Sequence, residues 1–352
     1  MSDTMLAAML HGARDIRVES CAQPKPGPGM VLLRVRRAGI CGSDSHYFAR
    51  GDCGPFVPTR PFILGHEFTA NVAALGEGVT APVVGTRVTV NPARACGFCS
   101  YCSSGRRNLC RKTIMLGSAS TKPPTDGAFA EYVTVRADQC HVLPAELDDT
   151  IGAMMEPLAV ALHAVKRAGA VSGKHVLVMG GGPIGLLTAM TARAFGAVPV
   201  VLSDIVPARR KLALDFSADL ALDPAVKHLS EQVSSLTGDG FDVILEASGA
   251  RPALRQAFDL IRPGGTIVQI GTLGVEDVPL PANHLMLREI QLVGSFRYGN
   301  VFDEAIRLAA SGRLNLRPLL TGLFPLAQTL DAMKQADDKT NALKVQIEVT
   351  AP

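Results

Sequence analysis

One short stretch near the start of the chain combines a thiol, an imidazole and several carboxylates. Cys41, Asp44, His66 and Glu67 all fall within Gly39–Glu67. Thiolate, imidazole and carboxylate are the ligand types that divalent zinc prefers. We therefore predict a catalytic metal site in this stretch. The alternative is a buried thiol beside a hydrogen-bonded histidine, which is the commoner case for a lone Cys/His pair.

Farther along, two, two and seven residues separate four cysteines, Cys96, Cys99, Cys102 and Cys110. Two-residue gaps let consecutive thiolates converge on one ion, and the intervening glycines permit tight turns. Four thiolates close a tetrahedron and leave no open position, so we predict a structural zinc rather than a catalytic one. An iron–sulfur cluster uses similar spacings and is the alternative. The single set of four and the long last gap favour zinc.

A glycine-rich loop follows the apolar run at residues 175–180. Residues 180–185 read GGGPIG, a GxGxxG pattern that leads into a helix-compatible segment, and in this context the pattern indicates a dinucleotide site. Gly180 would make the turn, Gly182 would admit the pyrophosphate, and Gly185 would allow close helix–strand packing. The phosphates would meet the positive end of the helix. A glycine-rich turn without a ligand is the alternative.

Asp204 ends the next apolar run, where an acid accepts the ribose hydroxyls of the dinucleotide. A 2′-phosphate at this place would meet like charge. At ~5 Å and an effective dielectric constant of ~20, the repulsion is about 3 kcal/mol per unit charge, or on the order of 100-fold in affinity. We therefore predict NAD rather than NADP. Arg209 and Arg210 keep the NADP alternative open, because an arginine can hold a 2′-phosphate.

The sequence pattern of the elements that carry these residues changes near Ile151. Before it, short β-like runs separated by Gly and Pro predict an antiparallel β-rich domain. These runs are residues 31–38, 68–74 and 87–91. No long helical periodicity is found before Thr150.

After Ile151, apolar runs alternate with helix-compatible segments. The runs are residues 175–180, 199–204, 242–247 and 266–271, and the helical segments are residues 186–195, 207–216 and 252–260. This alternation predicts a doubly wound parallel sheet, and with it the α/β fold class. Near the end of the chain we expect helices over 302–310 and 326–335 and a strand over 343–349.

Composition limits the possible partners. The chain has 352 residues, 47% hydrophobic and 19% charged, which suits a well-packed protein of two domains. Its net charge of +3, without long basic runs, gives no reason to expect nucleic acid or a membrane surface. No apolar stretch reaches the roughly 18 residues of a membrane span, and the start of the chain lacks a signal-peptide pattern. We expect a cytoplasmic protein whose eight cysteines are metal ligands and free thiols.

Together these motifs resemble the zinc-dependent medium-chain dehydrogenases along nearly the whole chain. Gly65-His66-Glu67 is similar to the family's Gly-His-Glu signature, with Ala70 where the family has a glycine. The resemblance implies a GroES-like catalytic domain over residues 1–152 and 293–352, with a structural-zinc lobe at about 93–113. It also implies a Rossmann NAD-binding domain over residues 153–292.

Within the family, the likeness is to the polyol and sugar-acid branch, which includes sorbitol, xylitol and L-idonate 5-dehydrogenases. Residues 41–47, 155–158 and 294–298 carry this likeness. By resemblance, each chain binds two zinc ions, one structural and one catalytic. The implied ligands of the catalytic zinc are Cys41, His66 and Glu67, with Glu156 binding it directly or through its water. Either glutamate can be the inner ligand.

The resemblance also implies zinc-assisted hydride transfer from a substrate hydroxyl to NAD. Ser43 and His46 would pass the hydroxyl proton to solvent. The expected catalytic residues are Ser43, His46, Glu67 and Glu156. The expected substrate contacts are Tyr47, Glu156, Arg297 and Tyr298. The expected cofactor contacts, besides the loop glycines and Asp204, are Ile184, Arg209, Ile270, Thr272 and Ser295.

The substrate class follows from further likenesses. Residues 117–120 and 126–129 are more similar to idonate dehydrogenases than to sorbitol enzymes, and Arg297 can hold a carboxylate bidentately. We expect an aldonate such as L-idonate, oxidised at a secondary hydroxyl to 5-keto-D-gluconate. Neutral polyols are the alternative substrates, and a non-catalytic dinucleotide-binding sensor is the alternative function. The family's common dimers and tetramers imply a homo-oligomer.

Overall fold

The computed structural model describes residues 3–274 and 276–350, which form two compact units. The first contains the chain up to Glu156, Phe302–Gly312 and the chain from Leu316 onward, and the second contains Pro157–Val301 and Arg313–Asn315. The changeovers after Glu156 and after Val301 come slightly later along the chain than the expected domain boundaries at 152/153 and 292/293. Met1 and Ser2, which enter the expectation about a signal peptide, lie outside the described residues.

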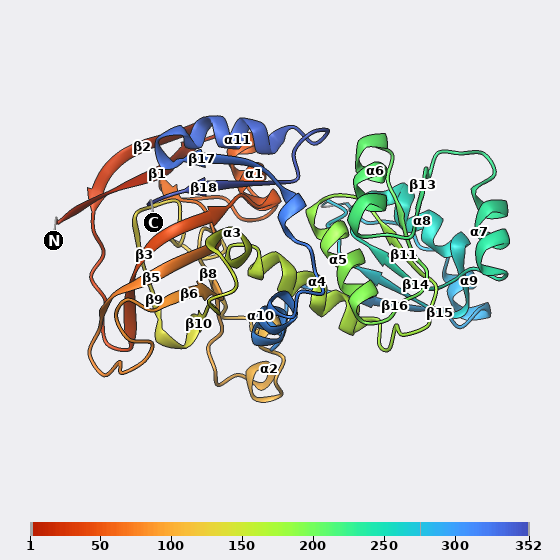
Figure 1. Ribbon diagram of the computed structural model, residues 1–352, viewed down its shortest axis with the longest axis horizontal. Helices are drawn as coiled ribbons and strands as arrows, with labels where there is room; N and C mark the ends of the chain where they lie inside the picture. Colours follow the sequence, from red (N-terminus) through yellow and green to blue (C-terminus); the bar gives the residue numbers. More distant parts are fainter. Residues whose placement is uncertain (1–2, 275, 351–352) are drawn as a thin grey trace. The chain divides into compact units, whose positions relative to one another are not determined.

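Two main sheets and one two-stranded sheet lie in the first unit (Figure 1). The smaller main sheet has the strand order β2-β1-β4, with β1 Thr4–Gly12, β2 Asp15–Ala22 and β4 Phe62–Ile63. The larger has the order β10-β6-β5-β3-β18-β17, with β9 also pairing with β3. Its strands are β3 Met30–Gly39, β5 Glu67–Leu75, β6 Arg87–Val90, β9 Tyr132–Arg136, β10 Cys140–Val142, β17 Leu320–Pro325 and β18 Lys344–Glu348. The predicted antiparallel pairing is confirmed, except that β17 and β18 are parallel.

Smaller elements complete this unit. The helices are α1 Gly42–Arg50, α2 Ser100–Ser103, α3 Asp149–Gly152, α10 Phe302–Ala310 and α11 Thr329–Asp337, and a two-stranded sheet joins β7 Ala93–Arg94 to β8 Ile114–Met115. Single 3₁₀ turns occur at Arg107–Leu109, Ala137–Gln139, Arg317–Leu319 and Leu326–Gln328. The helix expected over 326–335 therefore starts with a 3₁₀ turn, and α11 begins at Thr329.

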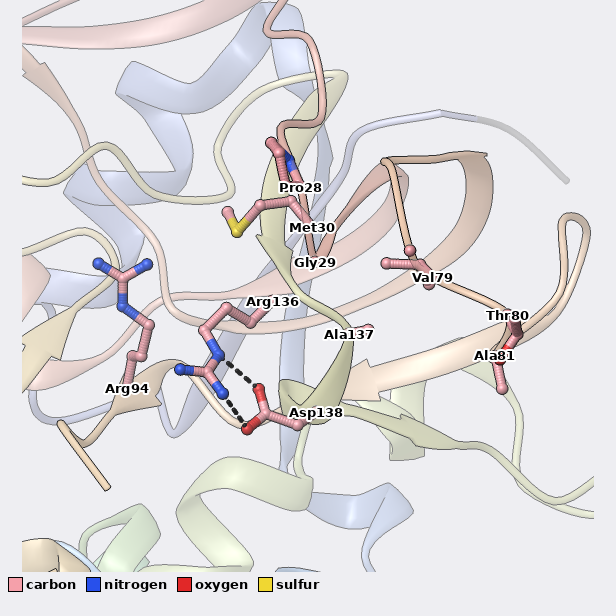
Figure 2. A pocket seen from close by; sticks show the side chains of 11 residues that line it. Pro28, Gly29, Met30, Val79, Thr80, Ala81, Arg94, Arg136, Ala137 and Asp138 are labelled. Atoms are coloured by element: carbon pink, nitrogen blue, oxygen red, sulfur yellow. Dashed lines mark hydrogen bonds and ion pairs between the residues drawn. The ribbon is translucent and has the colours of Figure 1, made fainter. Parts of the chain in front are cut away.

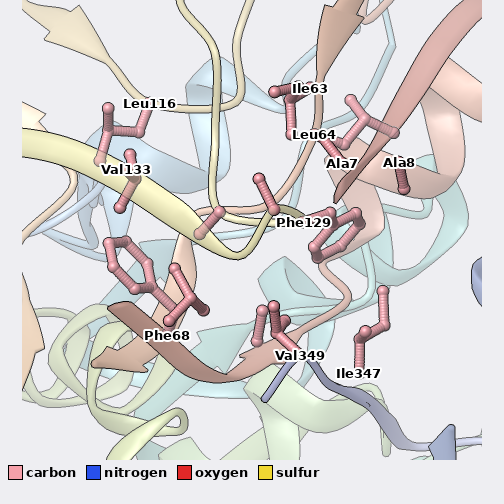
Figure 3. Close-up of a cluster of buried hydrophobic side chains, with 14 of the residues drawn as sticks. Ala7, Ala8, Ile63, Leu64, Phe68, Leu116, Phe129, Val133, Ile347 and Val349 are labelled. Carbon is pink, nitrogen blue, oxygen red and sulfur yellow. The ribbon is translucent and has the colours of Figure 1, made fainter. Parts of the chain in front are cut away.

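The core of the first unit packs against the segment that carries His66. Phe68 and Phe129 are among its largest fully buried side chains (Figure 3). A Cβ atom on Gly65 would lie 2.4 Å from the Phe129 ring, so the residue before His66 must be glycine at this place. Hydrophobic packing thus helps to fix the backbone of a predicted metal ligand.

The second unit contains one parallel sheet with the order β13-β12-β11-β14-β15-β16. Its strands are β11 Val176–Met179, β12 Val200–Ser203, β13 Leu220–Leu222, β14 Phe241–Glu246, β15 Ile261–Gln269 and β16 Gln291–Gly294. Its helices include α5 Pro183–Ala194, α6 Pro207–Phe216, α7 Leu229–Thr237, α8 Arg251–Leu260 and α9 Ala282–Leu287. This strand order is that of dinucleotide-binding sheets, with the switch point between β11 and β14, and it confirms the predicted doubly wound sheet.

One helix of the first unit was not expected from the sequence. No long helical periodicity is found before Thr150, yet the chain forms α1 there. Farther along, α4 spans Met155–Arg167. In α1, the Cys41 N–H donates to Asp44 Oδ2 at 2.9 Å, and Gly51 ends the helix in the left-handed region with φ +84°. These two caps offset the weak helix propensity of Gly42 and Ser43.

Candidate metal and cofactor sites

Three of the predicted metal ligands converge in the first unit. Cys41 caps the start of α1, His66 precedes β5, and Glu67 is the first residue of β5. One ligand atom from each lies within 4.8 Å of the other two. Gly39, paired with Glu67 across β3 and β5, makes room for this arrangement, because a Cβ there would lie 2.5 Å from Glu67 Oε2. The structure thus brings together a thiol, an imidazole and a carboxylate.

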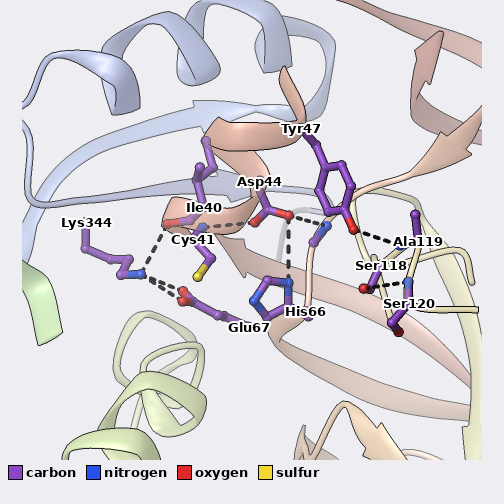
Figure 4. A network of polar contacts seen from close by, with 11 residues as sticks. Ile40, Cys41, Asp44, Tyr47, His66, Glu67, Ser118, Ala119, Ser120 and Lys344 are labelled. Carbon is purple, nitrogen blue, oxygen red and sulfur yellow. Dashed lines mark hydrogen bonds and ion pairs between the residues drawn. The ribbon is translucent and has the colours of Figure 1, made fainter. Parts of the chain in front are cut away.

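Asp44 organises the two ligand segments (Figure 4). Its carboxylate is completely buried and accepts the N–H groups of Cys41 at 2.9 Å and of Gly65 at 3.3 Å. Its Oδ1 also lies 3.7 Å from His66 Nδ1. A carboxylate behind a histidine ligand fixes the orientation of the ring. Asp44 lies in the sequence motif, but its role as an anchor was visible only in the structure.

Lys344 is a site residue that the sequence does not reveal. Its Nζ donates to both oxygens of Glu67, at 2.9 and 2.7 Å, and to the Ile40 carbonyl at 3.1 Å. Both members of this ion pair are buried, Lys344 at 4% and Glu67 at 1% exposure. β18 pairs with β3, and β3 with β5, so sheet pairing brings these distant residues together.

The charges around these residues suit a cation. Burial lowers the pKa of His66, but Asp44, Cys41 and more distantly Glu156 outweigh it and hold that pKa well above its usual value. Glu156 is buried in the first turn of α4 and also acts on Lys344. A buried excess of negative groups requires a compensating cation. The donor set and its charge therefore fit zinc, which Cys41, His66 and a glutamate would hold.

The other predicted residues of this region lie on α1. Ser43 and His46 are three residues apart on this helix, and His46 is exposed. Such a spacing places two side chains side by side. Tyr47 is 2% exposed, its hydroxyl accepts the Ala119 N–H at 2.9 Å, and its ring packs on Phe62. These contacts connect Tyr47 to the 117–120 segment.

The four cysteines form a second cluster, with one sulfur from each within 4.8 Å of the others. Cys102 Sγ lies 3.5 Å from Cys99 Sγ and 3.9 Å from Cys96 Sγ. Burial raises the pKa of Cys110, but the backbone N–H groups of Cys96 and Lys112 donate to its sulfur and lower that pKa to about 6. The backbone thus favours a thiolate, which is the form that binds metal.

Replacing Cys99 by serine should remove one zinc equivalent from the chain and lower its stability. A harder oxygen would replace one of four thiolates, and a structural zinc contributes directly to folding. Metal analysis and thermal denaturation measure both effects. Cys140→Ser, at a cysteine outside the cluster, is the control. An unchanged zinc content in Cys99→Ser would contradict the assignment.

The glycine-rich loop lies at the carboxyl end of β11, beside the switch point of the sheet. Gly180 has φ +103°, so it makes the turn in the left-handed region. A Cβ on Gly185 would come 1.7 Å from the Gly180 carbonyl oxygen, whereas a Cβ on Gly182 would meet nothing within 4 Å. Gly185 therefore serves close packing, and Gly182 leaves open space in front of α5. This is the environment that a pyrophosphate needs.

Asp204 follows β12 and points back toward this loop. Its carboxylate accepts the N–H groups of Gly181 at 2.6 Å and Val206 at 2.7 Å. Arg209 Nη1 lies 3.8 Å from the same carboxylate, and Arg210 donates to the Asp204 carbonyl at 2.7 Å. The acid expected to bind the ribose, Asp204, therefore lies next to both arginines that could instead hold a 2′-phosphate.

The remaining predicted cofactor residues follow the ends of neighbouring elements. Ile184 is in the first turn of α5, Ile270 and Thr272 follow β15, and Ser295 follows β16. The Ser295 hydroxyl is buried without a hydrogen-bond partner among the described residues, so it is available to a ligand. These positions and Gly180 share the carboxyl edge of the parallel sheet, where such sheets bind ligands.

A buried acid that the sequence does not single out organises this edge. Glu246 ends β14, is fully buried, and accepts the backbone N–H groups of Ser248 at 2.8 Å and Gly249 at 3.0 Å. Gln269 also donates to it at 2.6 Å. Glu246 fixes the two loops that follow β14 and β15. An isolated Glu at a strand end has no sequence signal for this role.

Arg297 and Tyr298 lie in the segment after β16. Arg297 has φ +51°, which is rare for a residue with a side chain, and its guanidinium lies 4.9 Å above the Phe296 ring. Tyr298 is buried, whereas Phe296 is 56% exposed. The backbone of this segment is therefore held in an unusual conformation at Arg297, one of the residues expected to bind substrate.

A separate cavity of about 500 Å³ opens in the first unit near residues 28–30 and 78–81 (Figure 2). Arg136 lines it and is held by Asp138 through two hydrogen bonds of 2.9 and 2.8 Å. None of the predicted site residues lines this cavity. No described helix is long and apolar enough to cross a membrane.

Comparison with known proteins identifies the family of the chain. The zinc-binding dehydrogenase family matches residues 183–311, and the alcohol dehydrogenase GroES-like domain matches residues 27–145. The chain is 36% identical to a sorbitol dehydrogenase of Bacillus subtilis (strain 168) over 345 residues, which cover 97% of each protein.

Solved structures extend this likeness to the fold. L-idonate 5-dehydrogenase from Escherichia coli K-12 superimposes with a TM-score of 0.91 and 33% identity over 98% of both chains. A Sinorhizobium meliloti 1021 protein solved with bound NADP superimposes with a TM-score of 0.91 and 34% identity, over 99% of this chain and 100% of that one. The predicted GroES-like domain and Rossmann-type sheet are thus confirmed. The chain belongs to the zinc-dependent medium-chain dehydrogenases, in their polyol branch.

Proposed function

We propose that the protein is a zinc- and NAD-dependent dehydrogenase that oxidises a secondary hydroxyl of a sugar acid, with L-idonate to 5-keto-D-gluconate as the best candidate. The convergence of Cys41, His66 and Glu67 in a buried, negatively charged setting carries the proposal. The glycine-rich loop at the switch point of the parallel sheet supports the cofactor. Neutral polyols such as sorbitol and xylitol are the second candidate substrates, favoured by the likeness to sorbitol dehydrogenase.

Cys41, His66 and Glu67 are proposed as the protein ligands of the catalytic zinc, with Glu156 beside it. When bound, the zinc would lower the pKa of a coordinated hydroxyl. Glu67, and not Glu156, is grouped with Cys41 and His66, which supports Glu67 as the glutamate that binds the zinc directly. Glu67→Gln should then lose catalytic zinc, whereas Glu156→Gln should retain it and lose turnover. Metal analysis of both variants is the test, and zinc loss in Glu156→Gln alone would reverse the order.

NAD is proposed as the preferred cofactor. The Asp204 carboxylate beside the loop supports this preference, since it would repel a 2′-phosphate. Asp204→Ala should narrow the NAD/NADP preference by on the order of 10- to 100-fold, because it removes the repulsion and frees Arg209 from its ion pair. Ratios of kcat/KM for the two cofactors measure the change, with Asp215→Ala on α6 as an exposed control. An unchanged ratio would remove Asp204 from this role.

Arg297 and Tyr298 are proposed as substrate contacts, and so is Tyr47, whose hydroxyl accepts the Ala119 N–H. A fixed guanidinium suits the carboxylate of an aldonate. Initial rates of NAD reduction with L-idonate, sorbitol and xylitol are the direct test. A clear preference for a neutral polyol would defeat the aldonate assignment. Failure of every alcohol to reduce NAD, in zinc-loaded protein, would instead favour a dinucleotide-binding sensor.

A homo-oligomer, dimer or tetramer, and a location in the cytoplasm are also proposed. β16 is an edge strand of its sheet, and the adjacent α9 exposes Met286 and Leu287 at 62% and 73%. Exposed apolar side chains beside an open strand edge favour pairing with a second copy. None of the eight cysteines is joined in a disulfide, as a reducing compartment permits. The mass of the purified protein in solution tests the assembly, and a monomer would contradict it.

A further inference from the structure

Helix α4 holds both ends of the segment that carries Arg297. At one end, Arg167 Nε donates to the Gly294 carbonyl at 3.0 Å. At the other, the Gly299 N–H donates to His163 Nδ1 at 3.4 Å. His163 and Arg167 are four residues apart, so both project from one face of the helix. One helix face therefore sets the positions at which Gly294–Gly299 starts and ends.

The segment between these anchors has a conformation that its own sequence does not favour. Arg297 is in the left-handed region at φ +51°, where a side chain is disfavoured. Such backbone persists only when the surroundings over-determine it, and it is concentrated at functional sites. The buried Tyr298 and the α4 contacts supply the constraint. Loss of an anchor should let Arg297 relax toward ordinary backbone angles and redirect its guanidinium.

The state of the His163 ring fits an acceptor role. Burial lowers the pKa of His163, and the neighbouring cations Arg167 and Lys166 lower it further. The ring is therefore neutral near pH 7. A neutral imidazole that accepts at Nδ1 carries its proton on Nε2, whereas an imidazolium could not accept the Gly299 N–H.

We propose that His163 is a positioning residue for substrate binding, which holds the Gly299 amide so that Arg297 and Tyr298 keep their substrate-binding conformation. His163 acts through the segment and not on the substrate itself. The proposal rests on the proposed function, because that function assigns substrate contacts to Arg297 and Tyr298. It adds a positioning residue two turns along α4 from Glu156, which is itself one of the expected substrate contacts.

The kinetic test compares His163→Leu, which removes the acceptor, with His163→Asn, whose side-chain oxygen can take the place of Nδ1. In His163→Leu we expect the KM for the polyhydroxy substrate to rise about tenfold, the effect of one lost hydrogen bond. The KM for NAD and the zinc content should not change. His163→Asn should restore most of the substrate KM. His228→Leu, at an exposed histidine of the same unit, is the matched control.

Hydrogen exchange separates this inference from the proposed function. In the zinc- and NAD-loaded protein, peptides over residues 294–301 should exchange about tenfold faster in His163→Leu than in wild type and His228→Leu. If wild type oxidises no polyhydroxy compound, the proposed function fails and the exchange result still tests the anchor. Unchanged exchange, or an unchanged substrate KM in an active enzyme, would overturn the proposal. If His163→Leu does not fold, a wild-type exchange rate and KM in His163→Ala would overturn it equally.

Discussion

Replacing Ser43 by alanine is expected to reduce turnover about 10²- to 10⁴-fold, the range over which positioned proton transfer contributes to catalysis. When an alcohol is oxidised, the hydroxyl oxygen must lose its proton and the carbon that carries this hydroxyl must lose a hydride. A serine hydroxyl can accept that proton and donate its own onward. His46, one turn further along α1, is exposed and can pass the proton to solvent. Partial desolvation of the ring by its neighbours, together with Arg50 and Lys339, lowers the pKa of His46, which favours the neutral imidazole that can accept a proton.

The readout must separate proton transfer from metal binding, because Ser43 lies close to Cys41 in the chain. Zinc content and the KM for NAD should be unchanged in Ser43→Ala while kcat falls. Ser45→Ala, on the same helix, should stay within a few-fold of wild type. His46→Gln should lose less activity than Ser43→Ala, because water can reach this exposed position. Full turnover in Ser43→Ala would refute the relay.

Local spacing predicted the parts of the two sites that lie within one loop or one turn. The four cysteines and residues 180–185 are closely spaced, and steric rules at such short range allow few arrangements. The parallel sheet was predictable for a similar reason, because alternating apolar runs and helices have few ways to pack. The convergence of Cys41, His66 and Glu67 was harder to predict, because it depends on how β3, β5 and α1 pack together.

The residues that the sequence could not reveal are those that act through tertiary contacts. Lys344 reaches Glu67 only because β18 pairs with β3, and nothing near Lys344 in the chain indicates a partner. Glu246 is one acid among 32 acidic residues, and its role depends on two loops from different strands. Helix α1 is stabilised by the caps at Cys41 and Gly51, and the helix propensities of its residues do not include such caps. In each case the decisive contact is a hydrogen bond to a buried charge or backbone group.

Lys344→Met should lower the free energy of unfolding by about 3–5 kcal/mol, the cost of breaking a buried ion pair from one side. Methionine keeps much of the volume of lysine but removes the ammonium from both Glu67 oxygens. Glu67 is 1% exposed, so water cannot replace the lost hydrogen bonds. Chemical denaturation without added zinc measures the effect, because no metal then compensates the charge of Glu67. Lys211→Met, which breaks an exposed pair with Asp215, should cost no more than about 0.5 kcal/mol.

Two further measurements identify the uncompensated carboxylate as the cause. Lys344→Met combined with Glu67→Gln should be less destabilised than Lys344→Met alone, because a neutral amide needs no cation. Excess zinc should also stabilise Lys344→Met more than wild type, since a divalent cation bound at Cys41, His66 and Glu67 would compensate the same charge. If Lys344→Met were no less stable than Lys211→Met, the Glu67–Lys344 pair would not be a structural part of the metal site. Stability and metal affinity would then depend on separate residues, whereas the buried pair couples them through the single carboxylate of Glu67.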